Sequence, residues 1–305
     1  MSDERGAAFS APSAHSSLIT HRSSLSSMAQ QEAQLRAHLV EIGRRIYESG
    51  YVAATDGNLS ARLDDGTVLT TPTMVCKGRM TPDMLVLVDV NGTKLRPEER
   101  NPSSEFAMHR EIYRLRADVR AVVHAHPPFG TGFAVANVAL DKPLLSEVIL
   151  TLGCIPLTAY GTPSTKELSE SLTAYIPHHD ALLLANHGAV AYGSDLEAAY
   201  AKMETLEHFA KINLIARLVG KPQELPAAAI EKLLDVREKA GYMPAEFRNC
   251  QACGFIQGHA ATCAVGSATR SYSPANGDET VTLTRRELTA LIMEAARLIA
   301  REMGR

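Results

Sequence analysis

The sequence predicts an α/β protein in which helices with one apolar face cover a sheet of short strands. Apolar residues recur at helical spacing in residues 31–49 and again in 194–220. Two continuous apolar runs, 120–126 and 181–187, have the length and composition of buried strands. The chain has 305 residues, of which 45% are hydrophobic, so it can enclose a substantial core.

The first 30 residues are rich in Ser and Ala and lack the uninterrupted apolar core of a secretory signal. We interpret them as a disordered tail. The folded domain is expected to begin at residue 31, because one helical stripe starts shortly afterwards and contains Leu35, Leu39, Ile42 and Ile46.

Residues 55–70 are expected to form a hairpin of two short strands, since an Asp-Gly turn signal at 65–66 separates them. A helix should then run from the segment Pro102-Ser103-Ser104-Glu105 to about Leu115, with the serines at its cap and Glu105 in its first turn. The amides of a helix N-terminus attract anions, so Ser103 and Ser104 are placed to hold a phosphate. Simple capping is the alternative.

Three histidines end the two apolar runs. His124 and His126 close the first, and alternate side chains of a strand lie on one face, so these two can approach one metal ion together. His187 ends the second run. Three imidazoles with an open fourth position are typical of a catalytic zinc site, whereas structural zinc sites are filled by four protein ligands. An exposed strand edge would explain an isolated His-x-His, but these runs are apolar up to their histidines.

Composition excludes several classes of function. The chain has 31 Lys and Arg against 34 Asp and Glu, a net charge of −3, so no overall basic field favours nucleic acid or an acidic membrane surface. No apolar stretch approaches the roughly 18 residues of a membrane span. Five cysteines, an odd number with no disulfide framework, indicate a reducing compartment such as the cytoplasm.

Six motifs occur in an order and spacing that resemble the class II aldolase/adducin family over roughly residues 31 to 220. They are Thr55-x-Gly57-Asn58-x-Ser60, Thr71-Pro72-Thr73, Ser103-Ser104-Glu105, His124-x-His126, Tyr160-Gly161-Thr162-Pro163 and Asn186-His187-Gly188. Each motif alone would be weak, and the set together is specific.

The resemblance implies a three-layer α/β/α domain around a central, mainly antiparallel sheet, usually assembled as a homotetramer with active sites between subunits. It implies one Zn²⁺ per subunit, or another divalent metal, held by His124, His126 and His187, and it matches Glu105 to the catalytic acid/base. The positions that match the family's cradle for the substrate phosphate are Gly57, Asn58, Thr73, Ser103 and Ser104.

The resemblance favours a zinc aldolase, a lyase that cleaves a ketose 1-phosphate such as L-fuculose or L-rhamnulose 1-phosphate to dihydroxyacetone phosphate and lactaldehyde. Glu105 favours an aldolase or the related dehydratase, because the family's epimerases typically carry aspartate there. The alternatives are a methylthioribulose-phosphate-type dehydratase, a pentose-phosphate 4-epimerase and a non-catalytic, metal-stabilised oligomeric scaffold. The sequence does not identify the sugar.

Two residues depart from the pattern of the family's fuculose phosphate aldolases. Met74 replaces a glycine after Thr73, and Glu147 stands where those enzymes carry a tyrosine thought to protonate the aldehyde oxygen. Tyr160 and Tyr242 are other candidates for that acid, so its identity stays open.

The catalytic domain is expected to span 31–225, followed by a helical extension at 226–265. This extension contains Cys250, Cys253, His259 and Cys263, whose spacing is compatible with a second metal site or with ordinary thiols in a loop. A linker at 266–283 then leads to an amphipathic helix at 284–305. That helix either docks on its own or a neighbouring subunit, or directs the enzyme into a bacterial microcompartment by binding a shell protein.

Overall fold

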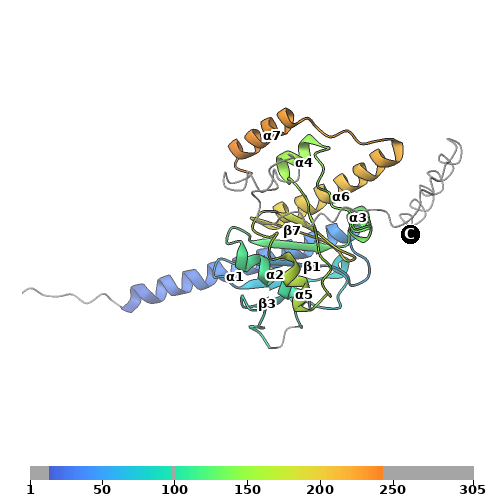
Figure 1. The fold of residues 1–305 in the computed structure, drawn as a ribbon. Coiled ribbons are helices and arrows are strands. Elements are labelled where there is room, and N and C mark those ends of the chain that lie inside the picture. Colours follow the sequence, from blue (N-terminus) through green and yellow to red (C-terminus); the bar gives the residue numbers. More distant parts are fainter. Residues whose placement is uncertain (1–13, 98–99, 243–305) are drawn as a thin grey trace, which may run out of the picture. The chain divides into compact units, whose positions relative to one another are not determined.

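The structure is a computed structural model that describes residues 14–97 and 100–242, with side chains described from residue 28 onward (Figure 1). The chain divides into two compact units, Met1–Gly266 and Ser267–Arg305, and all described residues belong to the first. The predicted Cys/His cluster at 250–263, the linker at 266–283 and the helix at 284–305 lie outside the described residues.

Helices and strands alternate along the first unit. In chain order they are α1 (Ala14–Glu48), β1 (Asn58–Arg62), β2 (Val68–Thr70), the 3₁₀ turns η1 (Lys77–Arg79) and η2 (Pro82–Met84), β3 (Val86–Val88), α2 (Phe106–Leu115), β4 (Ala121–Ala125), α3 (Pro128–Val135), α4 (Ser146–Thr151), β5 (Leu157–Thr158), α5 (Lys166–Leu172), β6 (Ala181–Leu184), β7 (Gly188–Gly193), α6 (Leu196–Val219) and α7 (Ala227–Lys239). Within the described residues, no helix combines the length and the apolar character that a membrane span needs.

The strands form one seven-stranded sheet in the order β3-β2-β1-β4-β7-β6-β5. All neighbouring strands are antiparallel except β5 and β6, which are parallel. The predicted mainly antiparallel sheet is therefore confirmed. The predicted hairpin is also confirmed, because β1 and β2 pair across a turn in which Gly66 has a φ of 86°.

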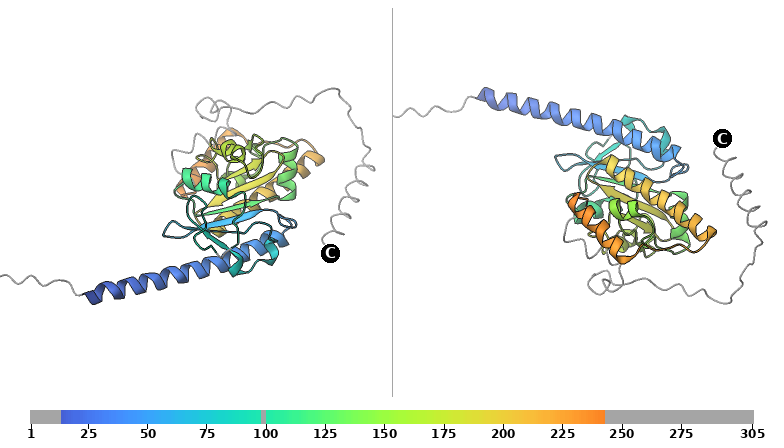
Figure 2. Two further views of the ribbon diagram at one scale, coloured as in Figure 1. Left: turned by 90° about the horizontal axis from the view of Figure 1, so that it is seen from below. Right: turned by 90° about the horizontal axis from the view of Figure 1, so that it is seen from above.

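Helices cover both faces of the sheet, as Figure 2 shows from two sides. Strand residues alternate between two cores: Val123 packs in the core that includes residues of α1, α3 and α6, whereas Val122 packs in the core that includes residues of α2 and α5. The alternation gives three layers, and it directs His124, which follows the parity of Val122, toward the face that α2 covers.

The first helix is longer than the sequence predicted. Leu39, Ile42 and Ile46 are fully buried as expected, but α1 begins at Ala14, so residues 14–30 are helical instead of forming part of a disordered tail. Adding a residue to an existing helix requires much less free energy than starting one. The buried C-terminal half therefore provides a nucleus from which the helix extends toward the N-terminus.

The extension predicted after residue 225 begins with α7, which packs on α4 (Figure 1). Ile230 and Leu234 of α7 bury against Ile149 and Cys154. The fully buried Arg237 donates to the carbonyl oxygens of Ile149 (3.2 Å) and Leu152 (3.3 Å), at the C-terminal end of α4. The extension is thus held by apolar contacts and by a cationic cap on α4.

A buried ion-pair cluster joins the ends of β6 and β7 to α6. Asp180 accepts hydrogen bonds from Arg116 (3.0 Å) and Lys202 (2.8 Å), and Lys202 also donates to the carbonyl of Tyr192. Burial raises the pKa of Asp180, but the positive charges of Lys202 and Arg116 outweigh burial and hold that pKa below its ordinary value. Asp180 is therefore ionised across the neutral pH range.

Replacing this carboxylate should destabilise the fold. Asp180→Asn removes the carboxylate that pairs with Lys202 and leaves Arg116 with Asp118. Breaking a buried pair in this way costs about 3 kcal/mol in the free energy of unfolding, measured by urea denaturation at pH 7. Because the folded-state pKa is depressed, the stabilisation is present above the unfolded pKa of about 3.9 and is lost as pH falls further, so the difference between wild type and variant should shrink in acid. Glu48→Gln, which removes an exposed partner of Arg44, is the control and should change stability far less. An equal effect of the two substitutions would contradict a stabilising role for the buried cluster.

Candidate metal and catalytic site

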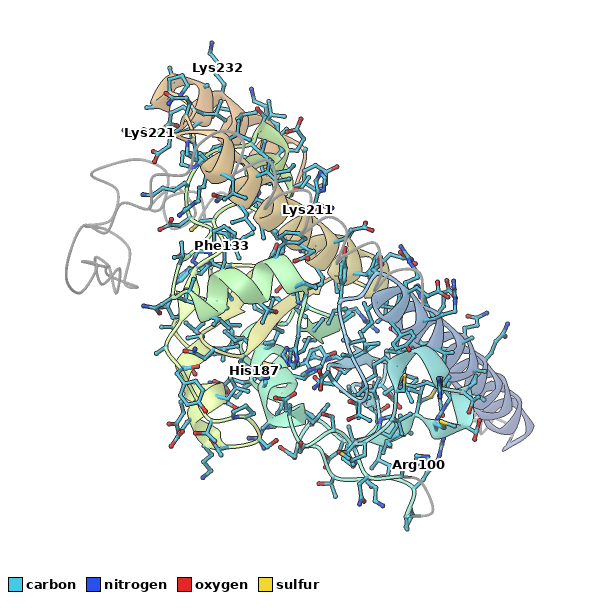
Figure 3. The ribbon with its side chains drawn as sticks, turned by 90° about the vertical axis from the view of Figure 1, so that its right-hand side faces the viewer. Arg100, Phe133, His187, Lys211, Lys221 and Lys232 are labelled. Atoms are coloured by element: carbon cyan, nitrogen blue, oxygen red, sulfur yellow. The ribbon has the colours of Figure 1, made fainter. Side chains whose placement is uncertain are left out.

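The pairing of β1, β4 and β7 brings the predicted site residues together. In the β1–β4 register Asn58 lies opposite His124, and in the β4–β7 register His124 lies opposite Val190. His187 stands in the short turn between β6 and β7, where Asn186 has a φ of 55°. The three histidine rings gather with their centroids 4.8 to 5.1 Å apart. Figure 3 labels His187.

One ring nitrogen of each histidine can serve a common metal ion, because these atoms all lie within 4.8 Å of one another. The Nδ1 of His124 donates to the carbonyl oxygen of Ala189 (2.9 Å), so its Nε2 carries the lone pair. The Nε2 atoms of His124 and His126 are buried and have no hydrogen-bond partner. Buried imidazole lone pairs that converge without partners fit a divalent metal such as zinc.

Glycine is required beside two of these histidines. A Cβ on Gly188 would lie 2.5 Å from Cδ2 of His126 and 2.7 Å from the carbonyl oxygen of Ala125. Gly57 has a φ of 69°, and a Cβ there would meet the carbonyl oxygen of His124 at 2.8 Å. The glycines of two predicted motifs therefore allow the backbone to approach the histidines closely.

His126 differs slightly from the prediction that it continues the strand of His124. β4 ends at Ala125, and the amide of His126 donates to the carbonyl of Tyr51 (2.8 Å), outside the sheet. The Nδ1 of His126 lies 3.5 Å from a carboxylate oxygen of Asp56, a residue that the sequence did not single out. A carboxylate beside a metal-binding histidine orients the ring.

Glu105 lies between two of the histidines. Its Oε1 is 3.2 Å from Nε2 of His187, and its Oε2 is 3.4 Å from Nε2 of His124. Burial raises the pKa of Glu105, but its attraction to the His124 and His187 rings outweighs burial and holds the pKa well below its ordinary value. The structure thus brings the predicted acid/base to the predicted ligand set, in its ionised form.

Glu105 occupies a different helix position from the predicted one. It is the residue before α2, not a member of the first turn, and neither it nor the preceding serines cap the helix through a side chain in the predicted manner. The hydroxyl of Ser103 instead accepts from the amide of Glu105 (3.3 Å). A carboxylate that points to imidazoles cannot also serve the helix amides, so the requirements of the site override capping.

The residues predicted to cradle a phosphate come from neighbouring segments. The amide of Thr73 donates to the carbonyl of Asn101 (3.0 Å), and the amide of Ser103 donates to the carbonyl of Thr71 (3.1 Å), so segments 71–73 and 101–103 lie side by side. The hydroxyl of Ser104 accepts from Ser164 (2.8 Å), in the loop after Tyr160. The phosphate role of Gly57, Asn58, Thr73, Ser103 and Ser104 stays a prediction.

A buried lysine, also missed from the sequence, supports these loops. Lys77 donates from Nζ to the carbonyl oxygens of Thr55 (2.9 Å) and Val75 (2.7 Å), and burial lowers its pKa to about 8. It joins the loop that contains Gly57 to the loop that contains Met74. The sequence around Lys77 did not predict this link, because nothing in a single lysine between turn residues indicates which distant carbonyl groups it will contact.

The two departures from the family pattern have different outcomes. Met74 has a φ of 57°, so it keeps the left-handed conformation that a glycine adopts freely, with its side chain 77% exposed. Glu147 lies in the first turn of α4, and Tyr160 and Tyr242 are exposed. The identity of the group that exchanges a proton with the aldehyde oxygen stays open.

Comparison with known proteins supports the sequence motifs. A family model described as the Class II Aldolase and Adducin N-terminal domain matches residues 37–214. A 3-oxo-tetronate 4-phosphate decarboxylase from Pectobacterium atrosepticum is 34% identical over 200 residues, which cover 64% of this chain and 90% of the relative. An L-fuculose phosphate aldolase from Methanococcus maripaludis is 34% identical over 179 residues, which cover 58% of this chain and 94% of the relative.

Solved structures agree with these relatives. The structure of an L-fuculose 1-phosphate aldolase has a TM-score of 0.63 and 30% identity to this chain, and the match covers 68% of this chain and 96% of that one. The likeness therefore extends over nearly the whole length of the solved protein.

Metal content provides a direct test of the ligand set. We expect purified protein reconstituted with zinc to bind about one ion per chain, and His124→Ala, which removes a ligand and leaves a buried gap, to bind almost none. His208→Ala is the control, because His208 is exposed on α6 and should leave binding unchanged. The measurement is elemental analysis after dialysis, and full metal retention by the His124 variant would reject the site.

Proposed function

Since the chain belongs to the class II aldolase and adducin family, we propose that it is a metal-dependent lyase. It breaks a carbon–carbon bond next to the carbonyl group of a small phosphorylated sugar or sugar acid. The observation that carries the proposal is the meeting of His124, His126 and His187 with the ionised carboxylate of Glu105. The proposal includes zinc as the metal and a homotetrameric assembly.

The chemistry requires two kinds of group, and the described residues provide both. A divalent metal held by the three histidines supplies positive charge that polarises the substrate carbonyl and stabilises negative charge on the neighbouring carbon. Glu105 moves the proton at that carbon, because it is ionised, largely buried and held close to the histidines. The hydroxyls of Thr73, Ser103 and Ser104 bind the phosphate without placing another charge beside the metal.

The first specific candidate is an aldolase acting on L-fuculose or L-rhamnulose 1-phosphate. The bond between C3 and C4 breaks, its electron pair stays on C3, and the hydroxyl proton of C4 leaves as the aldehyde forms. Protonation of C3 then gives dihydroxyacetone phosphate beside lactaldehyde. The likeness to proteins named L-fuculose phosphate aldolase and the glutamate at position 105 support this candidate.

The second candidate is the decarboxylation of 3-oxo-tetronate 4-phosphate, the substrate named for the Pectobacterium relative. Here the carboxylate leaves as CO₂, its electron pair stays on C2, and protonation of C2 gives the same dihydroxyacetone phosphate. No aldehyde forms in this reaction, so no group has to exchange a proton with an aldehyde oxygen. It therefore fits a chain in which Glu147 replaces the family's tyrosine.

One assay separates the two candidates. Zinc-loaded protein is incubated with L-fuculose 1-phosphate, L-rhamnulose 1-phosphate or 3-oxo-tetronate 4-phosphate, and dihydroxyacetone phosphate is followed by a coupled reduction with NADH. Lactaldehyde as the second product identifies the aldolase, and CO₂ identifies the decarboxylase. The absence of dihydroxyacetone phosphate from all three substrates would overturn the proposal in both forms.

Glu105→Gln tests the proton transfer. The amide keeps the size of the side chain but cannot accept a proton from carbon, so we expect kcat to fall by about 10²-fold or more while bound zinc is retained. The turnover assay and elemental analysis on the same preparation measure both quantities. Loss of zinc along with activity would instead make Glu105 chiefly a metal ligand.

A further inference from the structure

A chain of four hydrogen bonds runs from Glu105 into the core between β1 and α2. Asn58 Nδ2 donates to Glu105 Oε2 (2.7 Å), and Asn58 Oδ1 lies 2.5 Å from His109 Nε2. His109 Nδ1 lies 2.6 Å from Ser60 Oγ, which lies 2.7 Å from the hydroxyl of Tyr113. Asn58, Ser60 and His109 are 0 to 2% exposed, so water does not compete for these bonds.

The chemistry of the groups allows one direction for the chain. Asn58 presents its NH₂ group to a carboxylate oxygen of Glu105 and its amide oxygen, which can only accept, to His109. His109 Nε2 must then carry a proton. Burial and the nearby His124 lower the pKa of His109 to about 3, so the ring is neutral and its Nδ1 accepts from Ser60. Ser60 Oγ in turn accepts from Tyr113.

We propose that His109 is a positioning residue of the reaction: as the neutral, Nε2-protonated tautomer it fixes the orientation of the Asn58 amide and thereby holds the Glu105 carboxylate between His124 and His187. The part that concerns turnover rests on the proposed function. The part that concerns the tautomer and the Asn58 amide rests on the hydrogen bonds alone.

The alternative orientation shows why a donor at position 109 matters. If the Asn58 amide turned over, its oxygen would face the Glu105 carboxylate, and two acceptors would repel each other in a buried setting. Its NH₂ would face His109, whose Nε2 would then have to lose its proton to Nδ1. The Nε2 proton therefore fixes the orientation of the Asn58 amide, and the amide in turn holds Glu105.

The same chain defines a matched control. Tyr113 only donates to Ser60, so it lies beyond the bonds that set the direction at His109. Tyr113→Phe removes one buried hydroxyl at the far end and leaves the bonds of Ser60, His109 and Asn58 in place. Both His109 and Tyr113 are buried on α2, so substitutions at either disturb similar packing.

Nitrogen-15 NMR of the histidine rings tests the tautomer without any substrate. The His109 signals, assigned by their absence from His109→Gln, should show a protonated Nε2 and an unprotonated Nδ1 from pH 6 to 9. A charged ring or a proton on Nδ1 would overturn the proposal. This result holds whichever substrate the enzyme uses, so it separates failure of this inference from failure of the proposed function.

Turnover of the substrate identified above tests the positioning role. His109→Leu, which has no donor, should keep its zinc and its KM within about threefold but lose about tenfold or more in kcat, because a misplaced catalytic group slows the chemical step. His109→Gln, which offers both a donor and an acceptor, should recover at least part of that loss, and Tyr113→Phe should stay within about threefold of wild type.

Two outcomes would contradict the positioning role. Full kcat in a folded, zinc-loaded His109→Leu protein would show that the Asn58 amide keeps its orientation without a donor at position 109. Equal losses in His109→Leu and Tyr113→Phe would assign the effect to packing of α2. Should the leucine variant fail to fold in thermal melts, the comparison of His109→Gln with Tyr113→Phe and the ring spectra decide the question.

Discussion

The register of three antiparallel strands, β1, β4 and β7, is the constraint on which the rest of the site depends. It places Asn58 opposite His124 and sets the turn that contains His187 at the end of the neighbouring hairpin. A slip of one residue would turn His124 to the opposite face of the sheet, away from α2 and Glu105. The apolar residues of both cores oppose such a slip, because Val122 and Val123 would have to exchange faces.

The electrostatic balance of the site follows from this placement. A carboxylate with 13% of its side chain exposed would ordinarily be driven toward its neutral form, yet Glu105 stays ionised because imidazoles and an amide surround it. The groups that stabilise its charge sit on β1, β4 and the β6–β7 turn. The sheet therefore determines both the position of the Glu105 carboxylate and its ionisation state.

Features with a local cause could be read from the sequence. Asp195 caps α6 and Gly220 ends it, the Asp-Gly turn closes the β1–β2 hairpin, and the apolar runs before His124 and His187 form strands. The start of α1 was missed because extension of a helix depends on a nucleus much further along the chain. Asp56, Lys77 and the bond from Asn58 to His109 were missed because each depends on residues brought together by tertiary pairing.

The histidines come from two segments far apart in the chain, His126 after β4 and His187 before β7, and this separation has a consequence for assembly. The ligands converge only after those strands have paired, so the unfolded chain has no preformed site. A metal that prefers the native state shifts the folding equilibrium by mass action, and it also ties the ends of the long intervening segment together. With a metal bound at the proposed site, metal supply would determine how long the folded protein persists as well as whether it reacts.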